Sequence, residues 1–167
     1  TRIYVTPVNA VLAAEPGAVR ALAHITGGGI SENLNRALPA SCDAVVELGT
    51  WPVPPVISFV CDAANLSEEE ALKTFNMGTG MILIVDPERV RAVEEALAAA
   101  GEKTYRIGRI VEGTGEVAYE NEGELYGTCR RSSTPSPTMR FPSRSSTLSR
   151  RAPMRTASNV REPRVSA

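Results

Sequence analysis

The amino-acid sequence predicts an α+β fold, in which helices pack on a mixed sheet. Two segments carry this prediction. Residues 81–85 are five consecutive apolar residues, which is typical of a buried strand. Residues 88–100 place apolar side chains at helical spacing and end at Gly101, which is typical of an amphipathic helix. Because segments of both kinds alternate along the chain, we expect a sheet covered by helices.

The elements expected before residue 40 follow this alternation. Residues 2–5 are short and β-prone, and residues 8–15 have a helix-forming composition that ends at a Pro-Gly pair. Residues 19–25 form an apolar strand that runs into three glycines. Residues 31–38 have helical character, and Ser31 is the expected N-cap.

Two helix starts are well marked between residues 40 and 120. Ser67 is followed by three glutamates, which predicts a capping box with carboxylates at the positive end of the helix dipole. Pro87 is expected to open the helix of residues 88–100. The remaining strands are expected at residues 42–48, 104–111 and 116–119, and a further helix at residues 56–64.

The charge distribution divides the chain in two. Residues 1–126 carry nine Lys and Arg against eighteen Asp and Glu, whereas residues 127–167 carry nine Arg against one Glu. Residues 127–167 are rich in Ser, Arg and Pro and lack a hydrophobic period, so we expect a disordered tail after a domain over residues 1–126. The tail is either a basic arm for nucleic acid or an extension foreign to the fold, and we favour the second.

Composition excludes several classes of protein. The chain of 167 residues suits one domain with a core, and no apolar segment is long enough to cross a bilayer. No secretory signal is recognisable, and the three cysteines, Cys42, Cys61 and Cys129, lack metal-binding spacing. We therefore expect a cytoplasmic protein with reduced thiols, without a membrane or a nucleic acid as its partner.

Three successive glycines, Gly27, Gly28 and Gly29, separate the apolar strand from the next helix. Glycines permit the left-handed backbone and the close approach that a bound oxyanion needs, and amides at a helix start can point at a phosphate. The alternative is a flexible turn without a ligand. His24, the only histidine, precedes the glycines and is either a proton donor or acceptor or a packed side chain.

A second glycine-containing segment precedes the buried strand of residues 81–85. Asn76, Gly78 and Gly80 indicate a tight bend where the backbone comes close to a ligand or to another chain segment. The alternative is a β-bulge with no ligand.

Together these motifs resemble the phosphoribosylformylglycinamidine cyclo-ligase (aminoimidazole ribonucleotide synthetase) family. The resemblance lies in residues 21–29 with Glu32 and Asn33, in Trp51 with its prolines, and in residues 74–81. The opening residues 1–5 and the later residues 105–108 also fit, so it covers about residues 1–120. It implies the α+β fold of that family's C-terminal domain.

The resemblance implies an ATP-dependent ring closure that converts formylglycinamidine ribonucleotide to 5-aminoimidazole ribonucleotide. In that family ATP and Mg²⁺ are bound mainly by an N-terminal half, and the enzyme is a homodimer. The sequence has no GxxxxGK[ST] motif, so we expect the isolated chain to be inactive. By position, His24 is the catalytic candidate and no residue is expected to bind metal. The expected substrate-binding residues are Thr26, Gly27, Gly28, Gly29, Asn33, Asn76 and Gly78.

Two alternatives remain at the level of the sequence. One is a stand-alone module that binds a phosphate ligand, and the other is a domain of a related ATP-dependent synthetase. The Thr-Phe-Asn-Met-Gly segment favours the cyclo-ligase over the related synthetases. An exposed apolar surface is expected where the N-terminal half would sit.

Overall fold

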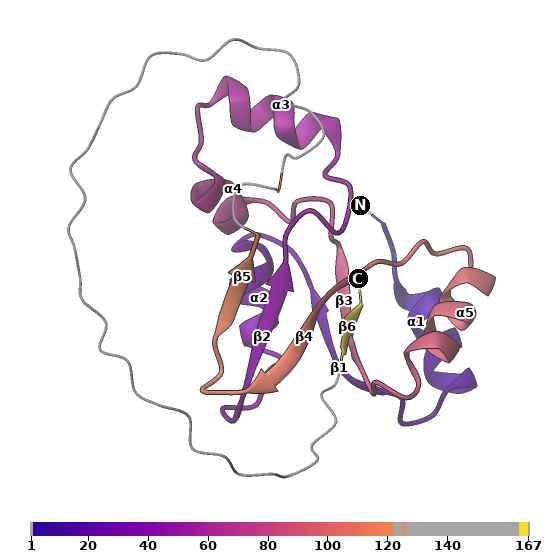
Figure 1. Ribbon diagram of the computed structural model, residues 1–167. Coiled ribbons are helices and arrows are strands. Elements are labelled where there is room, and N and C mark those ends of the chain that lie inside the picture. The colour runs from indigo at the N-terminus through magenta and orange to yellow at the C-terminus, as the bar shows by residue number, and fades with distance from the viewer. Residues whose placement is uncertain (1, 122–124, 126–163, 167) are drawn as a thin grey trace.

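A six-stranded mixed sheet forms the centre of the structure, a computed structural model that describes residues 2–121, 125 and 164–166 (Figure 1). Its strand order is β1-β3-β6-β4-β2-β5. Neighbouring strands are antiparallel except β2 and β5, which are parallel. The strands are β1 (Val19–His24), β2 (Cys42–Glu47), β3 (Met81–Val85), β4 (Arg106–Glu112), β5 (Val117–Glu120) and β6 (Arg164–Ser166).

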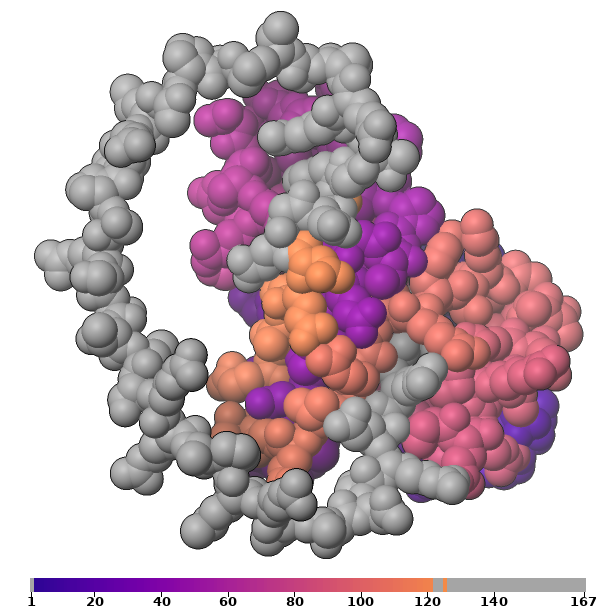
Figure 2. All heavy atoms as spheres, in the orientation of Figure 1, coloured from indigo at the N-terminus to yellow at the C-terminus, as the bar shows by residue number. Residues whose placement is uncertain are grey.

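The helices pack in pairs, with α1 against α5 and α2 against α4. In Figure 1, α1 and α5 lie together beside the β1–β3 side of the sheet, and α3 lies at the far end of the molecule. In the space-filling view, the salmon-coloured segment that includes α5 lies on the right of the molecule (Figure 2). The helices are α1 (Val5–Ala14), α2 (Gly29–Asn35), α3 (Pro55–Ala63), α4 (Glu68–Thr74) and α5 (Val90–Ala99).

Strand β3 is buried on both faces, which explains why its sequence is a continuous apolar run. Ile82 and Ile84 belong to the core cluster that includes α2 and α4. Leu83 and Val85 point the other way, into the cluster that includes α1 and α5. Because side chains alternate across a strand, a strand covered on both sides needs apolar residues at every position. The predicted α+β fold is therefore confirmed, with β3 between the two cores.

Three local predictions differ from the structure. Residues 2–4 form no strand, and α1 begins at Val5, because Tyr4 packs on Gly80 and His24 instead of pairing with a neighbour. Ser31 is not an N-cap, since α2 starts two residues earlier, after Gly28 at φ +92°. Pro87 lies in a turn before α5, which begins at Val90.

Part of the predicted tail belongs to the sheet. Arg164–Ser166 form β6 between β3 and β4. The prediction of a disordered tail is therefore wrong for these three residues. Residues 126–163 and 167 lie outside the described residues, and with them most of the predicted tail. In the part of the chain that the structure describes, the helices are too short or too polar to span a bilayer.

Candidate functional site

The two glycine motifs, far apart in the sequence, lie side by side at one end of the β1–β3 pair. His24, the last residue of β1, is opposite Met81, the first residue of β3. The Ile25 N–H donates to the Gly80 carbonyl oxygen at 2.9 Å. Because the strands are antiparallel, the segment leaving β1 and the segment entering β3 meet there. The pairing of these two strands thus brings the motifs of residues 24–29 and 76–80 together.

The three glycines of the first motif have different structural roles. Gly28 and Gly29 have φ of +92° and +64°, which disfavours residues with a side chain. A methyl group on Gly29 would also overlap the carbonyl oxygen of Leu72, at the contact between α2 and α4. Gly27 has neither constraint, since a methyl group on its Cα would meet nothing within 4 Å. The fold therefore requires Gly29 but leaves the space at Gly27 open.

Asn33 holds the glycine loop together from inside. Its Nδ2 donates to the carbonyl oxygens of Gly27 at 3.1 Å and Gly29 at 2.7 Å. Its Oδ1 accepts from the Thr26 hydroxyl at 3.3 Å. The Gly29 N–H donates to the Thr26 carbonyl oxygen at 3.2 Å, so this amide is engaged within the loop. Asn33 and Thr26 accordingly shape the loop, which leaves fewer of its polar groups for a ligand.

The second motif is a tight turn, so of the two alternatives that the sequence left open the β-bulge is wrong. Met77 and Gly78 have φ of +50° and +92°, and the Thr79 N–H donates to the Asn76 carbonyl oxygen at 2.9 Å. The Asn76 side chain accepts from the Gly78 N–H at 3.0 Å, which closes the turn further. The indole Nε1 of Trp51 donates to the Met77 carbonyl oxygen at 3.0 Å, so the proline-rich segment fixes the turn from one side.

His24 is exposed at the surface beside the N-terminal segment. Its ring meets the Tyr4 ring edge-on, with 6.2 Å between the ring centroids. It lines an apolar groove of about 420 Å³ together with Ile3, Val5, Asn9 and Met81, among others. The histidine is thus accessible at the end of the sheet where the two motifs meet.

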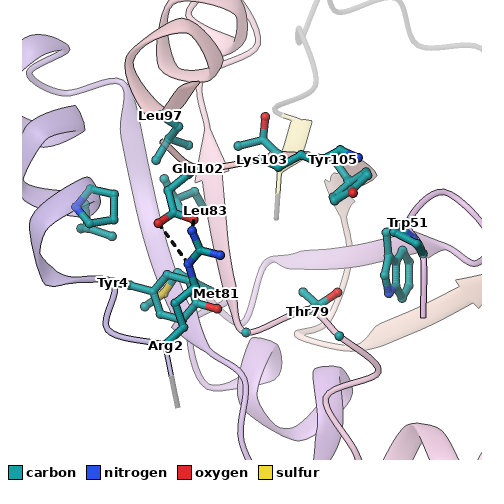
Figure 3. A pocket seen from close by; sticks show the side chains of 16 residues that line it. Arg2, Tyr4, Trp51, Thr79, Met81, Leu83, Leu97, Glu102, Lys103 and Tyr105 are labelled. Carbon is teal, nitrogen blue, oxygen red and sulfur yellow. Dashed lines mark hydrogen bonds and ion pairs between the residues drawn. The ribbon is translucent and has the colours of Figure 1, made fainter. Parts of the chain in front are cut away.

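A second cavity, of about 270 Å³, is shown in Figure 3. Both cavities are lined by Tyr4 and Arg2. Arg2 forms an ion pair with Glu102 at 2.9 Å. These lining residues were not among the site candidates that the sequence suggested. The resemblance of residues 1–5 to the family was the one signal that pointed to Arg2 and Tyr4.

The predicted site residues are therefore neighbours but do not all share one cavity. His24 lines the first cavity and Gly78 the second. The others lie in the two adjoining loops and line neither of these cavities: Thr26, Gly27, Gly28, Gly29, Asn33 and Asn76. Within the described ranges, no three His, Cys, Asp or Glu residues come close enough to hold a metal ion.

Comparison with known proteins first defines the fold. The crystal structure of E. coli HypE superposes with a TM-score of 0.56 at 22% sequence identity, over 74% of this chain and 37% of that chain. Residues 1–120 match the family described as AIR synthase related protein, C-terminal domain. The chain belongs to this family.

The curated relatives are longer proteins. The phosphoribosylformylglycinamidine cyclo-ligase of Brevibacillus brevis is 49% identical over 119 residues, 71% of this chain and 34% of that protein. The cyclo-ligase of Bacillus subtilis is 44% identical over 115 residues, 69% of this chain and 33% of that protein. The bifunctional purine biosynthetic protein purD of Dictyostelium discoideum is 46% identical over 111 residues, 66% of this chain and 13% of that protein. The chain thus spans about a third of the cyclo-ligases that it matches.

Proposed function

We propose that this chain is the substrate-side domain of a phosphoribosylformylglycinamidine cyclo-ligase. The complete enzyme would close the imidazole ring of 5-aminoimidazole ribonucleotide from formylglycinamidine ribonucleotide, as a homodimer in the cytoplasm. The observation that carries the proposal is the meeting of the two motifs at the β1–β3 end, where His24 is opposite Met81. The 49% identity to a cyclo-ligase supports the choice of reaction.

The substrate's phosphate is proposed to bind at the glycine loop from the side of Gly27. The space around Gly27 is open, so an anion can approach the backbone there. Thr26 and Asn33 hold the loop in shape through their mutual hydrogen bond. Their proposed role is to preorganise the loop, because fixed backbone donors bind an anion without reorganising.

His24 is proposed to act on the reacting end of the substrate. It is exposed, and its ring meets the Tyr4 ring edge-on. Imidazole side chains act as proton donors and acceptors in catalysis. Asn76 and Gly78 are proposed to contact the substrate through the backbone of their turn, which the Asn76 side chain closes.

ATP and Mg²⁺ are the cofactors that the resemblance to the cyclo-ligases implies for the complete enzyme. We propose that an N-terminal half of the enzyme binds both. ATP would activate the formyl oxygen for ring closure, and this chain would bind and orient the substrate.

The surface that meets this N-terminal half is proposed to include Ile3 and Val5. Their exposed fractions are 77% and 64%, and both line the groove that contains His24. Exposed apolar side chains beside a site are typical of a surface that another domain covers. Closure from this side would also exclude water from the histidine.

Calorimetry with ribose 5-phosphate tests the phosphate site. Gly27→Ala fills the open space without a clash or a positive φ, so we expect the variant to keep its fold and to bind at least about tenfold more weakly. Ribose without the phosphate is the control ligand. Equal binding of ribose 5-phosphate by Gly27→Ala and the unchanged chain would contradict a phosphate site at Gly27. Gly28→Val is less suitable, because φ +92° at Gly28 makes the variant strained.

Activity measurements test whether the reaction needs both this chain and an N-terminal half. The chain alone is expected to show no cyclisation of formylglycinamidine ribonucleotide with ATP, and addition of an N-terminal half from a related cyclo-ligase is expected to restore it. Turnover by the chain alone would contradict the proposal. Ribose 5-phosphate binding without any restored activity would instead favour a stand-alone binding module.

A further inference from the structure

Two parts of the central sheet are joined by a strand from outside the segment that matches the family. Strand β6 pairs antiparallel with residues 83–85 of β3 on one side and with residues 106–109 of β4 on the other (Figure 1). β3 and β4 are not neighbours in the sheet, because β6 separates them. We call this position the β3–β4 slot. Without a strand in it, the sheet would divide into β1–β3 and β4–β2–β5.

Both faces of the β3–β4 slot are covered by other parts of the chain. On one face, Ile84 of β3 and Ile107 of β4 belong to the same core cluster. On the other face, α5 packs on Leu83 and reaches β4 through an ion pair between Glu94 and Arg106 at 2.6 Å. Because successive side chains point to opposite faces, a strand covered on both faces needs apolar residues at every position. The slot therefore fits a continuous apolar strand.

The sequence of β6 does not meet this requirement. Its three residues are Arg, Val and Ser, so only the middle one is apolar. In contrast, β3 is apolar at each of its five positions. A strand of three residues is also at the short end of the range for sheets. A longer apolar strand would bury more apolar surface in the slot and would bind there more strongly than β6.

The length of the relatives indicates where such a strand comes from. The match to the family ends at residue 120, whereas β6 begins at residue 164, so the matched residues do not themselves fill the slot. The chain spans 34% of the Brevibacillus brevis cyclo-ligase, so most of that protein lies outside the matched part. Two strand edges that face each other across the width of one strand can bind an added strand through main-chain hydrogen bonds.

We propose that the β3–β4 slot binds an apolar strand of the N-terminal half of the enzyme, which displaces β6. This proposal rests on the proposed function, because the N-terminal half is part of that function. The contact is separate from the groove that Ile3 and Val5 line, since it is made by main-chain hydrogen bonds within the sheet. β6 occupies the slot when the N-terminal half is absent and competes with its strand.

Hydrogen–deuterium exchange on the full chain tests the displacement. In the chain alone, the paired amides of β3, β4 and β6 are expected to be protected. When an N-terminal half from a related cyclo-ligase is added, residues 164–166 are expected to exchange at least about tenfold faster, while β3 and β4 stay protected. A β6 that stays protected would overturn the proposal. The measurement needs no substitution, so it does not depend on the folding of a variant.

A proline in β6 tests the competition. Proline has no backbone N–H, so Val165→Pro removes a donor from the middle residue of β6. Because the competing strand is weakened, this variant is expected to bind the N-terminal half at least about threefold more tightly than the unchanged chain does. Fluorescence anisotropy of a labelled N-terminal half measures the affinity.

Val160→Pro is the matched control, since it makes the same substitution outside β6. It is expected to bind the N-terminal half as the unchanged chain does. If β6 only supported the fold, Val165→Pro would bind more weakly than this control. Binding by Val165→Pro that is weaker than or equal to that of Val160→Pro would contradict competition at the slot.

The possible outcomes separate the slot from the proposed reaction. Ribose 5-phosphate binding and cyclisation report on the glycine loop and on the reaction, whereas hydrogen exchange reports on the sheet. Restored cyclisation with a β6 that stays protected would overturn the slot and leave the proposed function intact. Displacement of β6 without cyclisation would support the slot and contradict the proposed reaction.

Discussion

At the scale of single residues, the glycine loop contains two positions with opposite tolerance. Gly29 has φ +64° and faces the Leu72 carbonyl oxygen, whereas Gly27 faces open space. Gly29→Ala is expected to lower the free energy of unfolding by about 3 kcal/mol, through backbone strain and displacement of α4. Gly27→Ala, the matched control, is expected to change it by less than about 1 kcal/mol. Urea denaturation measures both, and equal stabilities would contradict the contact between α2 and α4.

Asp43 is a second residue whose role follows from its contacts. Its Oδ1 accepts hydrogen bonds from the backbone N–H groups of Thr114 at 2.7 Å, Gly115 at 2.9 Å and Glu116 at 2.8 Å. These bonds, led by that from Glu116, lower the pKa of the Asp43 carboxyl below its ordinary 3.8. The carboxylate thereby fixes the connection between β4 and β5.

The lowered pKa of Asp43 predicts a pH dependence of stability. The stabilisation is fully present above the unfolded pKa of 3.8 and is lost as the pH falls through the folded pKa. Asp43→Asn keeps an acceptor oxygen but cannot titrate, so its unfolding free energy is expected to fall less steeply as the solution is made more acidic than this unfolded pKa. Parallel denaturant titrations at several pH values measure this. The same slope for both proteins would contradict the role of the carboxylate.

The backbone conformation of single residues could be predicted from the sequence where the residue type itself indicates the conformation. Successive glycines indicated left-handed backbone, and Gly28 and Gly29 have it. The engagement of Asn33 with Gly27 and Gly29 was not predictable, because it depends on how the loop folds back on α2. The residue type of Asn33 does not show whether its side chain points to the loop or to a ligand.

At the scale of elements, the start of α4 shows what a local signal determines. Ser67 accepts from the Glu70 N–H at 3.2 Å, and the Glu70 carboxylate accepts from the Ser67 N–H at 2.9 Å. This is the capping box that the sequence predicted. It needs no tertiary contact, which is why four residues sufficed to predict it.

Removal of this cap is expected to weaken α4. Ser67→Ala should lower the free energy of unfolding by about 1 kcal/mol, since it leaves the Glu70 N–H without its acceptor. Ser67→Thr keeps the hydroxyl and serves as the control. Thermal unfolding followed by circular dichroism measures the difference. A Ser67→Ala protein as stable as Ser67→Thr would contradict a stabilising cap.

The conformation of other segments depends on packing against residues that are distant in the sequence, so no local pattern predicts it. Residues 2–5 have β-prone composition, yet Tyr4 packs against Gly80 and Val5 starts α1. Their place was decided by distant residues. In contrast, β3 was predictable because a strand buried on both faces needs an apolar residue at every position, from Met81 to Val85.

At the scale of the whole molecule, the apolar surface beside His24 is expected to be needed by the complete enzyme. Val5 is the first residue of α1 and is 64% exposed, so Val5→Asp should not disturb the helix, where an acidic residue is favourable. When the variant is combined with a complementing N-terminal half, we expect at least about tenfold lower cyclisation, because a charge would be buried at the joint.

Val56→Asp provides a matched control for this prediction. Val56 is also in the first turn of its helix, α3, and is 66% exposed. Its helix, α3, lies at the top of the view in Figure 1, away from α1. This variant is expected to retain activity in the same assay. Equal activity of Val5→Asp and the original chain would contradict an interface at the groove of His24.

The pairing of the strands was not predictable from the order of the elements. The sequence indicated strands at residues 104–111 and 116–119 with a glycine-containing connection. In the structure these two strands do not pair with each other; β4 is antiparallel and β5 parallel to β2. Register depends on which strands meet, and no local pattern specifies that.

The position of β2 between β4 and β5 affects the order in which the chain can assemble during synthesis. Both neighbours of Cys42–Glu47 come from residues beyond 105, so the strand has neither partner while the intervening part of the chain is being made. Until the residues of β4 leave the ribosome, β2 has two open edges that could pair with other chains. Interruption of translation between β3 and β4 would therefore release a fragment prone to aggregation.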